Sequence, residues 1–399
     1  MPDTVGQDTL VARARALAPI IRAEADAGEA AGRLTDKTVA ALKDAGFFGL
    51  TVPKCFGGLE ANPVEALEVT EAISEADGST GWVLMACNVG TGSAAGYLPA
   101  SGAQAVFGER IPIIAGEGAP KGRAEVDGKG FRLTGRWSYG SGTLHTEWLH
   151  TGGTVYENGK PRLLPGTTTP EILTFIVPTR EAQFLGNWDT LGLRATGSVD
   201  YALKDVYVPA EFTHSPNAMI AEQGGDFYRI GIVGMSPLGH TGFTLGLGRR
   251  VLDELAALAR APAGRPSPLG DAGGGDSFHE GFGAAEAKLR AARAFCYEVW
   301  GDVTATLARA QPVTTRQFSL MRLCLNHLTT ELTEICTFAH RTGGGVSARG
   351  GILQRCFRDM FTATQHRIVS TAMLRHCGRD LAGMAEGQHW TSRGLFPAE

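Results

Sequence analysis

The sequence predicts an α+β protein in which a β-rich middle segment separates two helical regions. The first hundred or so residues carry apolar side chains at helical spacing. Near residue 111 the pattern changes to short runs rich in β-branched and aromatic residues, divided by Gly, Pro and Asn. Helical spacing returns after about residue 219. We therefore expect an N-terminal helical domain over 1–112, a middle β-barrel domain over 113–219 and a C-terminal helical bundle over 220–399.

Capping residues mark the helices of the first part. Residues 9–31 place Leu and Ile on one stripe and are expected to form one helix. Thr35 or Asp36 can cap the next helix, and an Asn-Pro pair starts a third over 62–76. The Gly- and Ala-rich segment 78–99 is expected to be a buried pair of helices.

Turn residues and periodicity organise the rest of the chain. Asp127-Gly128 marks a hairpin turn, and the strand spacing suggests a small antiparallel barrel or sandwich. Four long helical segments follow, the last over about 353–385, and short connections between them suggest an up-down bundle. The Gly- and Pro-rich stretch 261–277 is expected to be a loop between helices.

Composition excludes several classes of protein. The 399 residues carry a net charge of −4, which gives no general attraction to nucleic acid or anionic membranes. No apolar run approaches the roughly 18 residues of a membrane span, and the N-terminus lacks an apolar signal core. The seven cysteines are scattered, odd in number and without a C-x-x-C pair. We expect a cytoplasmic protein without a disulfide framework.

Common cofactor motifs are absent. The stretch GTGSAAG at 90–96 resembles a dinucleotide fingerprint, but its third Gly comes one residue late and no strand precedes it. The sequence contains no phosphate loop, no H-E-x-x-H metal motif and no G-x-S-x-G nucleophile elbow, and we assign no metal site. A nicotinamide nucleotide therefore has no recognisable domain of its own, and redox chemistry would need a cofactor held in another way.

One stretch near the middle concentrates aromatic and hydroxyl side chains. Residues 135–148, GRWSYGSGTLHTEW, run from a strand into a Ser-Gly turn. Aromatic planes beside small hydroxyls suit a flat ligand with a polar edge. The other interpretation is ordinary strand core, which is the more frequent use of such residues.

Four stretches, in this order along the chain, resemble the acyl-CoA dehydrogenase superfamily. They are LKDAGFFGLTVPKCFGG, GKGFRLTGRWSYGSGTLHTEW, NWDTLGLRATGSVDYALKDVYVP and GGGVSARGGILQRCFRDMFTATQH. The resemblance implies an N-terminal helical domain, a middle β-barrel and a C-terminal four-helix bundle, usually in a homotetramer. It is closest to the flavin-dependent monooxygenase branch, which includes aromatic hydroxylases and indole oxygenases.

A departure from the dehydrogenase pattern separates the two branches. Dehydrogenases of this fold usually carry a glutamate base after the last R-x-x-R-D helix, whereas here no acid follows Asp359 until Asp380. The monooxygenase branch tends to have a histidine in this region, and His366 matches it. An imidazole titrates near neutral pH, so His366 is the expected catalytic acid/base. The alternative is a histidine that only caps a neighbouring turn.

The resemblance also assigns residues around the middle turn. It implies that Ser141 hydrogen-bonds the flavin near its reactive edge, and that Gly142 lets the backbone approach the ring. A turn-stabilising serine is the equal alternative. Trp137 either lines the isoalloxazine or belongs to the barrel core.

A second loop is placed on the flavin by the same resemblance. Its hydroxyls and amides could hold ring or phosphate oxygens, or could simply form a series of turns. The residues concerned are Trp188, Arg194, Thr196, Gly197 and Ser198.

Further positions complete the predicted site. Arg355 and Arg358 either hold flavin phosphates, perhaps across a subunit interface, or pair with acids of the chain. Pocket-lining positions are Phe243, Trp82, Met85 and Asn88.

The expected activity is that of the oxygenase component of a two-component system. A separate flavin reductase uses NAD(P)H and supplies reduced FAD or FMN, O2 forms a flavin C4a-hydroperoxide, and one oxygen atom passes to a phenol- or indole-type substrate. Alternatives are an acyl-CoA dehydrogenase with a relocated base, an amino-sugar N-oxygenase of the same fold, and a flavin-free scaffold protein.

Overall fold

The N-terminal helices of the computed structural model, which describes residues 9–260 and 275–397, follow the capping signals closely. The expected helix over 9–31 is wrong in one respect: it is two helices that separate at Leu17. Pro19 lies in the first turn of the second helix and lacks the N–H that would continue the first. The early helices are α1 Leu10–Ala16, α2 Ala18–Ala31, α3 Asp36–Asp44, α4 Pro63–Ala76, α5 Gly78–Tyr97 and α6 Ala100–Phe107.

Side-chain caps start α3 and α4 where the sequence predicts. The Thr35 hydroxyl accepts the Thr38 amide of α3, and Asn62 and Glu65 form a reciprocal capping box on α4. The predicted helix pair over 78–99 is wrong, because α5 is a single helix. Its glycines face neighbours rather than breaking the helix: a Cβ on Gly90 would lie 2.6 Å from the Ile114 carbonyl oxygen.

The middle of the chain forms a nine-stranded sheet within the described residues. The sheet is mixed and not antiparallel as predicted, since β4 pairs in parallel with both β1 and β2. The predicted hairpin at Asp127-Gly128 is confirmed by the antiparallel pairing of β2 with β3. The strands are β1 Ile114–Ala115, β2 Gly122–Asp127, β3 Gly130–Trp137, β4 Trp148–Glu157, β5 Lys160–Pro161, β6 Ile172–Pro178, β7 Gln183–Phe184, β8 Tyr201–Pro209 and β9 Thr213–His214.

Helices return after the sheet and end in a small hairpin. The expected last helix over 353–385 is broken into α11 and α12, with a short 3-10 turn, η8 Arg367–Val369, between them. Residues 261–274 of the predicted loop lie outside the described residues. The elements are α7 Gly231–Ala259, α8 Gly275–Ala308, α9 Thr315–Thr342, α10 Gly344–Ala348, α11 Ile352–Ala363, α12 Thr371–Leu381, β10 Gln388–Thr391 and β11 Gly394–Pro397.

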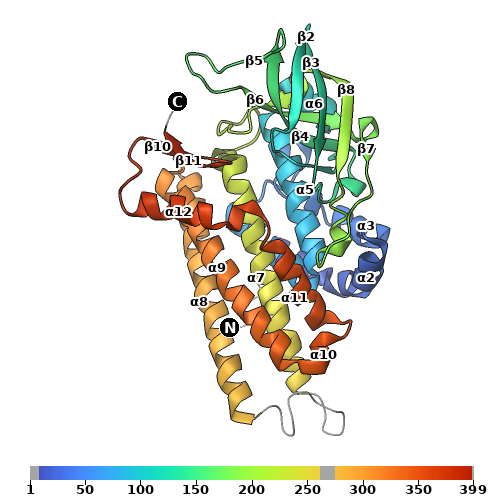
Figure 1. The fold of residues 1–399 in the computed structure, drawn as a ribbon, viewed down its shortest axis with the longest axis vertical. Coiled ribbons are helices and arrows are strands. Elements are labelled where there is room, and N and C mark those ends of the chain that lie inside the picture. The colour runs from blue at the N-terminus through green and yellow to red at the C-terminus, as the bar shows by residue number, and fades with distance from the viewer. Residues whose placement is uncertain (1–8, 261–274, 398–399) are drawn as a thin grey trace.

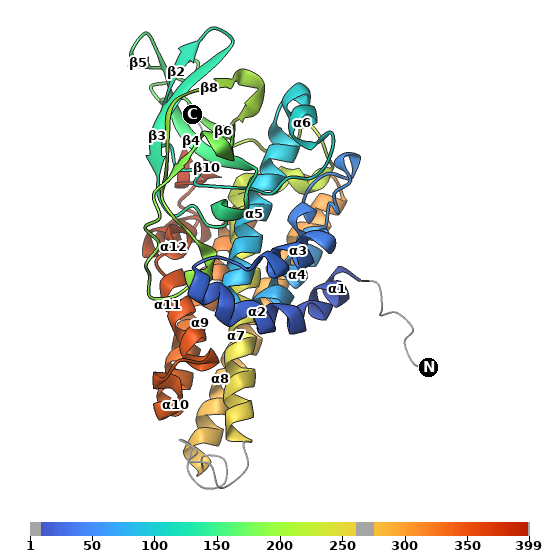
Figure 2. The same ribbon diagram turned by 90° about the vertical axis from the view of Figure 1, so that its right-hand side faces the viewer.

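The sheet lies at one end of the molecule, and the long helices α7, α8 and α9 extend away from it (Figure 1). Helix α5 runs from the sheet into the helical body beside α7 (Figure 2). One large apolar core joins the helices, and a second, built around Trp137, fills the sheet. The site described below lies where these two parts meet.

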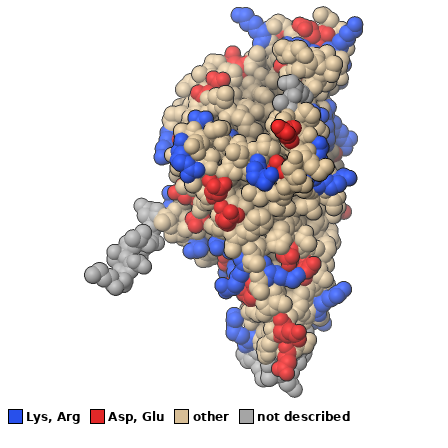
Figure 3. Space-filling view, turned by 90° about the vertical axis from the view of Figure 1, so that its left-hand side faces the viewer, with Lys and Arg blue, Asp and Glu red and all other residues tan. Residues whose placement is uncertain are grey.

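Membrane and metal binding find no support in the part of the chain that the structure describes. There, no helix is both long and apolar enough to cross a membrane. The same residues contain no group of three or more His, Cys, Asp and Glu side chains that could hold a metal ion. On the face shown in Figure 3, positive and negative side chains are interspersed.

Candidate functional site

The turn after β3 and the loop before β8 meet through their hydroxyl groups. The Ser141 Oγ lies 2.7 Å from the Ser198 Oγ, which lies 2.7 Å from the Thr196 Oγ1. The backbone reinforces this contact, because the Gly142 amide donates to the Thr196 carbonyl. Three residues predicted separately from two stretches of sequence therefore form one hydrogen-bonded group.

Trp82 of α5 connects this group to the helical bundle. Its Nε1–H donates to the Ser141 Oγ at 3.0 Å. Its ring packs edge-on against three others, with centroid distances of 5.1 Å to His240, 5.0 Å to Phe243 and 5.9 Å to His366. The predicted residues Ser141 and His366 thus both contact one indole, although 225 residues separate them in the sequence.

The break in the C-terminal helix positions His366. The residue caps η8, where its Nδ1 accepts the Ile368 amide at 3.3 Å, as the capping alternative predicts. The neutral tautomer that fits this bond carries its proton on Nε2. Burial, followed by the charge of Arg367, lowers the pKa of His366 to about 4. The side chain is nevertheless exposed to solvent.

Surrounding protein atoms disfavour the charged imidazole, while water still reaches the exposed part of the ring. His366 is a neutral imidazole at neutral pH, able to hold or transfer one proton.

His240, in the middle of α7, is a site residue that the sequence analysis missed. Its ring lies 4.4 Å from that of His366, centroid to centroid, and is 8% exposed. Nδ1 contacts the Ser236 carbonyl at 2.8 Å and must donate to it, which leaves a lone pair on Nε2. That buried Nε2 has no hydrogen-bond partner among the residues that the structure describes. Burial, followed by the charge of His366, lowers the pKa of His240 well below its usual value.

Gly142 and Gly197 both adopt backbone conformations that favour glycine. Their φ angles are +77° and +53°. A Cβ on Gly142 would lie 2.9 Å from the Cys87 Sγ of α5, and one on Gly197 would lie 2.7 Å from Leu144. These glycines let the two loops pack against α5 and against each other, which holds Ser141 in place.

Helix α11 holds the loop before β8. The Asp359 carboxylate accepts the Leu193 amide at 2.6 Å, and the Thr362 hydroxyl accepts the Gly192 amide at 2.8 Å. Leu193 has a φ of +52°, a conformation that a non-glycine residue rarely adopts without such support. Burial, followed by the nearby Asp77, raises the pKa of Asp359 to about 7.

The structure corrects the prediction for Arg355. Its guanidinium pairs with Glu29 at 2.6 Å and with Asp26 of the same chain. Arg358 likewise pairs with Glu29 and donates to the Leu191 carbonyl. Carboxylates of the same chain pair with both guanidinium groups, as the alternative interpretation expects. Neither guanidinium is therefore free to bind a phosphate in this structure.

The aromatic residues near the turn separate into core and surface. Trp137 is fully buried, stacks on Tyr201 and donates to two backbone carbonyls, so it belongs to the sheet core and has no face for a cofactor. Tyr139 is 68% exposed and contacts the half-buried Trp188 edge-on at 6.3 Å. Arg194 is exposed.

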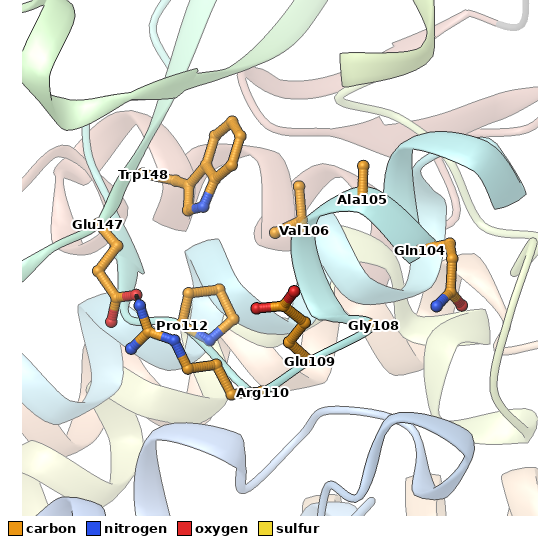
Figure 4. A pocket seen from close by; sticks show the side chains of 9 residues that line it. All are labelled: Gln104, Ala105, Val106, Gly108, Glu109, Arg110, Pro112, Glu147 and Trp148. Carbon is orange, nitrogen blue, oxygen red and sulfur yellow. Dashed lines mark ion pairs between the residues drawn. The ribbon is translucent and has the colours of Figure 1, made fainter.

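A separate hollow of about 430 Å³ lies between α6 and the start of β4 (Figure 4). Arg110 and Glu147 form an ion pair across its edge, with Trp148 beside them. None of the predicted site residues lines it. We therefore place the functional site at Trp82 and not here.

Comparison with known proteins agrees with this architecture. Residues 7–104 match the family model described as acyl-CoA dehydrogenase, N-terminal domain, and residues 238–371 match acyl-CoA dehydrogenase, C-terminal domain. The indole-3-acetate monooxygenase of Pseudomonas putida is 30% identical over 358 residues, which cover 85% of this chain and 84% of that protein. The chain belongs to the flavin-dependent monooxygenase branch of the acyl-CoA dehydrogenase superfamily.

Other members of the branch are similar over shorter stretches or in fold. The oxygenase component of the FADH(2)-dependent resorcinol hydroxylase of Rhizobium sp. is 30% identical over 55% of this chain and 54% of its own length. The crystal structure of the HsaA monooxygenase from M. tuberculosis superposes with a TM-score of 0.84 and 25% identity, covering 94% of this chain and 97% of that one.

The site fits the flavin that this family membership implies. A flavin needs flat apolar contacts together with hydrogen-bonding groups at one polar edge. The Trp82 indole and the neighbouring imidazoles supply the first, and the partly exposed Ser141 hydroxyl supplies the second. Trp188 and Arg194 lie on the same loop as the buried Thr196 and Ser198, but only the first two are accessible.

Proposed function

We propose that the chain is the oxygenase component of a two-component flavin-dependent monooxygenase acting on an aromatic or heteroaromatic substrate. One observation carries the proposal: the indole of Trp82 contacts both Ser141 and His366. Ser141 lies on the side of the β-sheet, here called the barrel side, and His366 lies on the side of the C-terminal helices, here called the bundle side. The overall reaction is ArH + O2 + reduced flavin giving ArOH, water and oxidised flavin. Atoms and electrons balance because the flavin supplies the two electrons that reduce the second oxygen atom.

The flavin, as FAD or FMN, supplies oxygen activation when it is bound, and the protein's own residues do the rest. Ser141 holds one polar edge of the ligand, with Gly142 setting the turn that presents it. The Trp82 indole, backed by the buried Phe243, is proposed to shield the reacting atoms from water. Trp188 and Arg194, which are accessible on the neighbouring loop, are proposed to contact the more polar part of the cofactor.

His366 manages the proton in this proposal. The ring is neutral at the pH of the cell, and its tautomer carries an Nε2–H that is not used by the turn. It can donate this hydrogen bond to an oxygen atom on the ligand, and it can take up a proton at Nδ1 once the bond to Ile368 is released. The ring of His240 lies beside it, 4.4 Å away from centroid to centroid.

Related proteins support the choice of cofactor and substrate class. XiaF from Streptomyces sp. was solved with FADH2 and glycerol, and superposes with a TM-score of 0.84 at 23% identity. TdsC from Paenibacillus sp. A11-2 was solved with FMN and indole, with a TM-score of 0.75 at 20% identity. Relatives named as an oxygenase subunit or component support a separate flavin reductase, which would take its electrons from NAD(P)H.

Assembly and location are further parts of the proposal. We expect a homotetramer, which light scattering on the purified protein would test. The cysteines are free and six of the seven are buried, which suits a reducing cytoplasm. Fractionation of cells that produce the full chain would test that location.

The activity is tested by supplying the missing electron source. Purified protein is mixed with a flavin reductase, NAD(P)H, FAD or FMN, and a panel of phenols and indoles, with catalase present to remove free hydrogen peroxide. The expected result is product whose amount matches the oxygen consumed. Unchanged substrate across the panel while NAD(P)H is consumed would contradict the proposal.

An acyl-CoA dehydrogenase with a relocated base would need another carboxylate as that base. Asp359 cannot be the base, because it is 2% exposed and accepts the Leu193 amide. Glu117 is the candidate. Glu117 is partly buried, burial raises its pKa, and it interacts with the charge of Arg367. Anaerobic reduction of an artificial acceptor by acyl-CoA thioesters, lost in Glu117→Gln, would favour that alternative. Amino-sugar substrates in the oxygenation assay would identify an N-oxygenase.

A further inference from the structure

The hydroxyl groups behind Ser141 form a hydrogen-bonded chain whose direction is set by the carbonyl at its buried end. The Thr196 hydroxyl lies 2.7 Å from the Leu193 carbonyl oxygen and must donate to it, because a carbonyl only accepts. Thr196 therefore accepts from Ser198 at 2.7 Å. The Ser198 proton is then engaged, so Ser198 must accept from Ser141, also at 2.7 Å.

Trp82 engages the Ser141 oxygen from the other side. Its indole N–H can only donate, and it does so to the Ser141 Oγ at 3.0 Å. A serine hydroxyl has one proton and two lone pairs. The Ser141 hydroxyl donates its hydrogen to Ser198 and accepts from Trp82 with one lone pair, so one lone pair of Ser141 remains free. A ligand atom that reaches the Ser141 oxygen must therefore donate a hydrogen.

Burial separates the residue that meets the ligand from those that orient it. Ser141 is partly exposed, whereas Thr196 and Ser198 are 1% and 3% exposed. The two buried hydroxyls cannot touch a cofactor that binds at Ser141. Their effect on any ligand passes through the direction of the Ser141 hydroxyl.

We propose that Thr196 and Ser198 are positioning residues that make the site discriminate between the two redox states of the flavin. The inference rests on the proposed function. A reduced isoalloxazine ring carries a hydrogen on N5, and the oxidised ring carries a lone pair on the same atom. With N5 facing Ser141, as the resemblance implies for the reactive edge of the flavin, the reduced ring would donate to Ser141, whereas the oxidised ring would place a lone pair against a lone pair. Reduced flavin is taken up and oxidised flavin is released, as an oxygenase fed by a separate reductase requires.

The ratio of affinities for reduced and oxidised flavin depends on the free energy needed to reverse the direction of the hydroxyl chain, which would let Ser141 donate to the ligand. Reversal would break the bond from the Thr196 hydroxyl to the Leu193 carbonyl. That carbonyl would keep two other donors, the Thr196 amide and the Trp188 indole. The preference therefore corresponds to about one neutral hydrogen bond, or roughly a fivefold ratio of affinities.

The test is an anaerobic titration of the full chain with oxidised and with reduced flavin, followed by flavin fluorescence or calorimetry. Wild-type protein is expected to bind reduced flavin more tightly. In Ser198→Ala the Ser141 proton becomes free to donate, so affinity for oxidised flavin should rise about fivefold while affinity for reduced flavin stays unchanged. Thr196→Val should act in the same direction. Ser198→Thr and Thr196→Ser keep the hydroxyls and should keep the wild-type ratio.

The sign of the change separates this role from a structural one. If both hydroxyl-removing variants weaken the two flavins equally, the chain only stabilises the loops, and the inference is overturned while the proposed function stands. Equal affinity of the wild-type protein for both flavins would also overturn it. A wild-type protein that binds neither flavin would remove the proposed function as well.

Discussion

The two sides of the site differ in how completely their polar atoms are bonded. On the barrel side, the hydroxyls of Ser141, Ser198 and Thr196 are joined in an unbroken hydrogen-bonded chain. On the bundle side, within residues 9–260 and 275–397, the His240 Nε2 is buried without a partner, and the His366 ring makes a long hydrogen bond of 3.3 Å to the Ile368 amide. A bonded network fixes geometry, whereas unsatisfied groups remain available to a ligand. We infer that the barrel side positions the ligand and the bundle side carries out proton transfer.

Removing the imidazole of the bundle side should give the largest effect. In His366→Ala we expect product formation to fall by at least about 100-fold, since positioned acid–base groups contribute roughly that much or more. Flavin binding should persist because Ser141 and Trp82 remain. Rates come from the reductase-coupled assay and affinities from flavin titration. His389→Ala changes an exposed histidine on β10 and is the control. Full turnover in His366→Ala would remove this residue from its role.

A buried carboxylate that supports the barrel side should make stability depend on pH. The pKa of Asp359 is about 7 in the fold, well above the ordinary aspartate value of 3.8 that applies to the unfolded chain. The folded state therefore binds more protons between these values, and the free energy of unfolding falls as pH rises from about 4 to about 7. Asp359→Asn does not titrate, so at pH 8 it should be more stable than wild type by on the order of a few kcal/mol.

Thermal unfolding from pH 5 to pH 8 measures this difference. The Asn side chain can still accept the Leu193 amide, so the loop before β8 should remain in place. Wild type and variant that lose stability in parallel across this range would show that Asp359 is ionised in the fold.

The second imidazole should matter less than the first. His240→Phe keeps ring contacts with Trp82 and His366 but removes the unpartnered nitrogen. We expect a drop of about tenfold in product formed per oxygen consumed, less than the roughly 100-fold that a positioned acid or base contributes. Flavin affinity should not change. Unaltered coupling would limit the role of His240 to packing.

The smallest effect should come from the bond that links the two sides. Trp82→Phe retains most of the aromatic wall and loses only the donor to Ser141. The bond lies within the protein, so its loss should lower the free energy of unfolding by about 1 kcal/mol, the usual value of one neutral hydrogen bond. Affinity for reduced flavin should stay unchanged, because Ser141 keeps a lone pair for the ligand. Thermal unfolding and anaerobic flavin titration measure the two quantities, and a much weaker flavin affinity would mean that the indole ring itself organises the site.

Local chemistry explains which parts of the fold could be predicted from sequence. The starts of α3 and α4 depend on Thr35 and Asn62, whose partners lie three residues away. The break around His366 could not be predicted, because the apolar spacing continues through it. The mixed sheet also escaped prediction, since strand pairing between β2 and β4 depends on contacts far apart in the sequence.

The site was predictable where resemblance supplied the long-range information. Ser141 and His366 were chosen from separate stretches, and the structure brings both to Trp82. Arg355 was misassigned because its carboxylate partners lie more than 300 residues away, near the N-terminus. His240 had only a weak signal, as a single imidazole in an apolar helical run three residues before Phe243.

The most direct test of the central claim is the fate of labelled oxygen. The protein is incubated with a flavin reductase, NAD(P)H, flavin, an aromatic substrate that it consumes, and 18O2 in ordinary water. Mass spectrometry of the product should show one 18O atom per molecule, in wild type but not in His366→Ala. A hydroxylated product without the label, or no product while all of the oxygen is converted to hydrogen peroxide, would contradict the account.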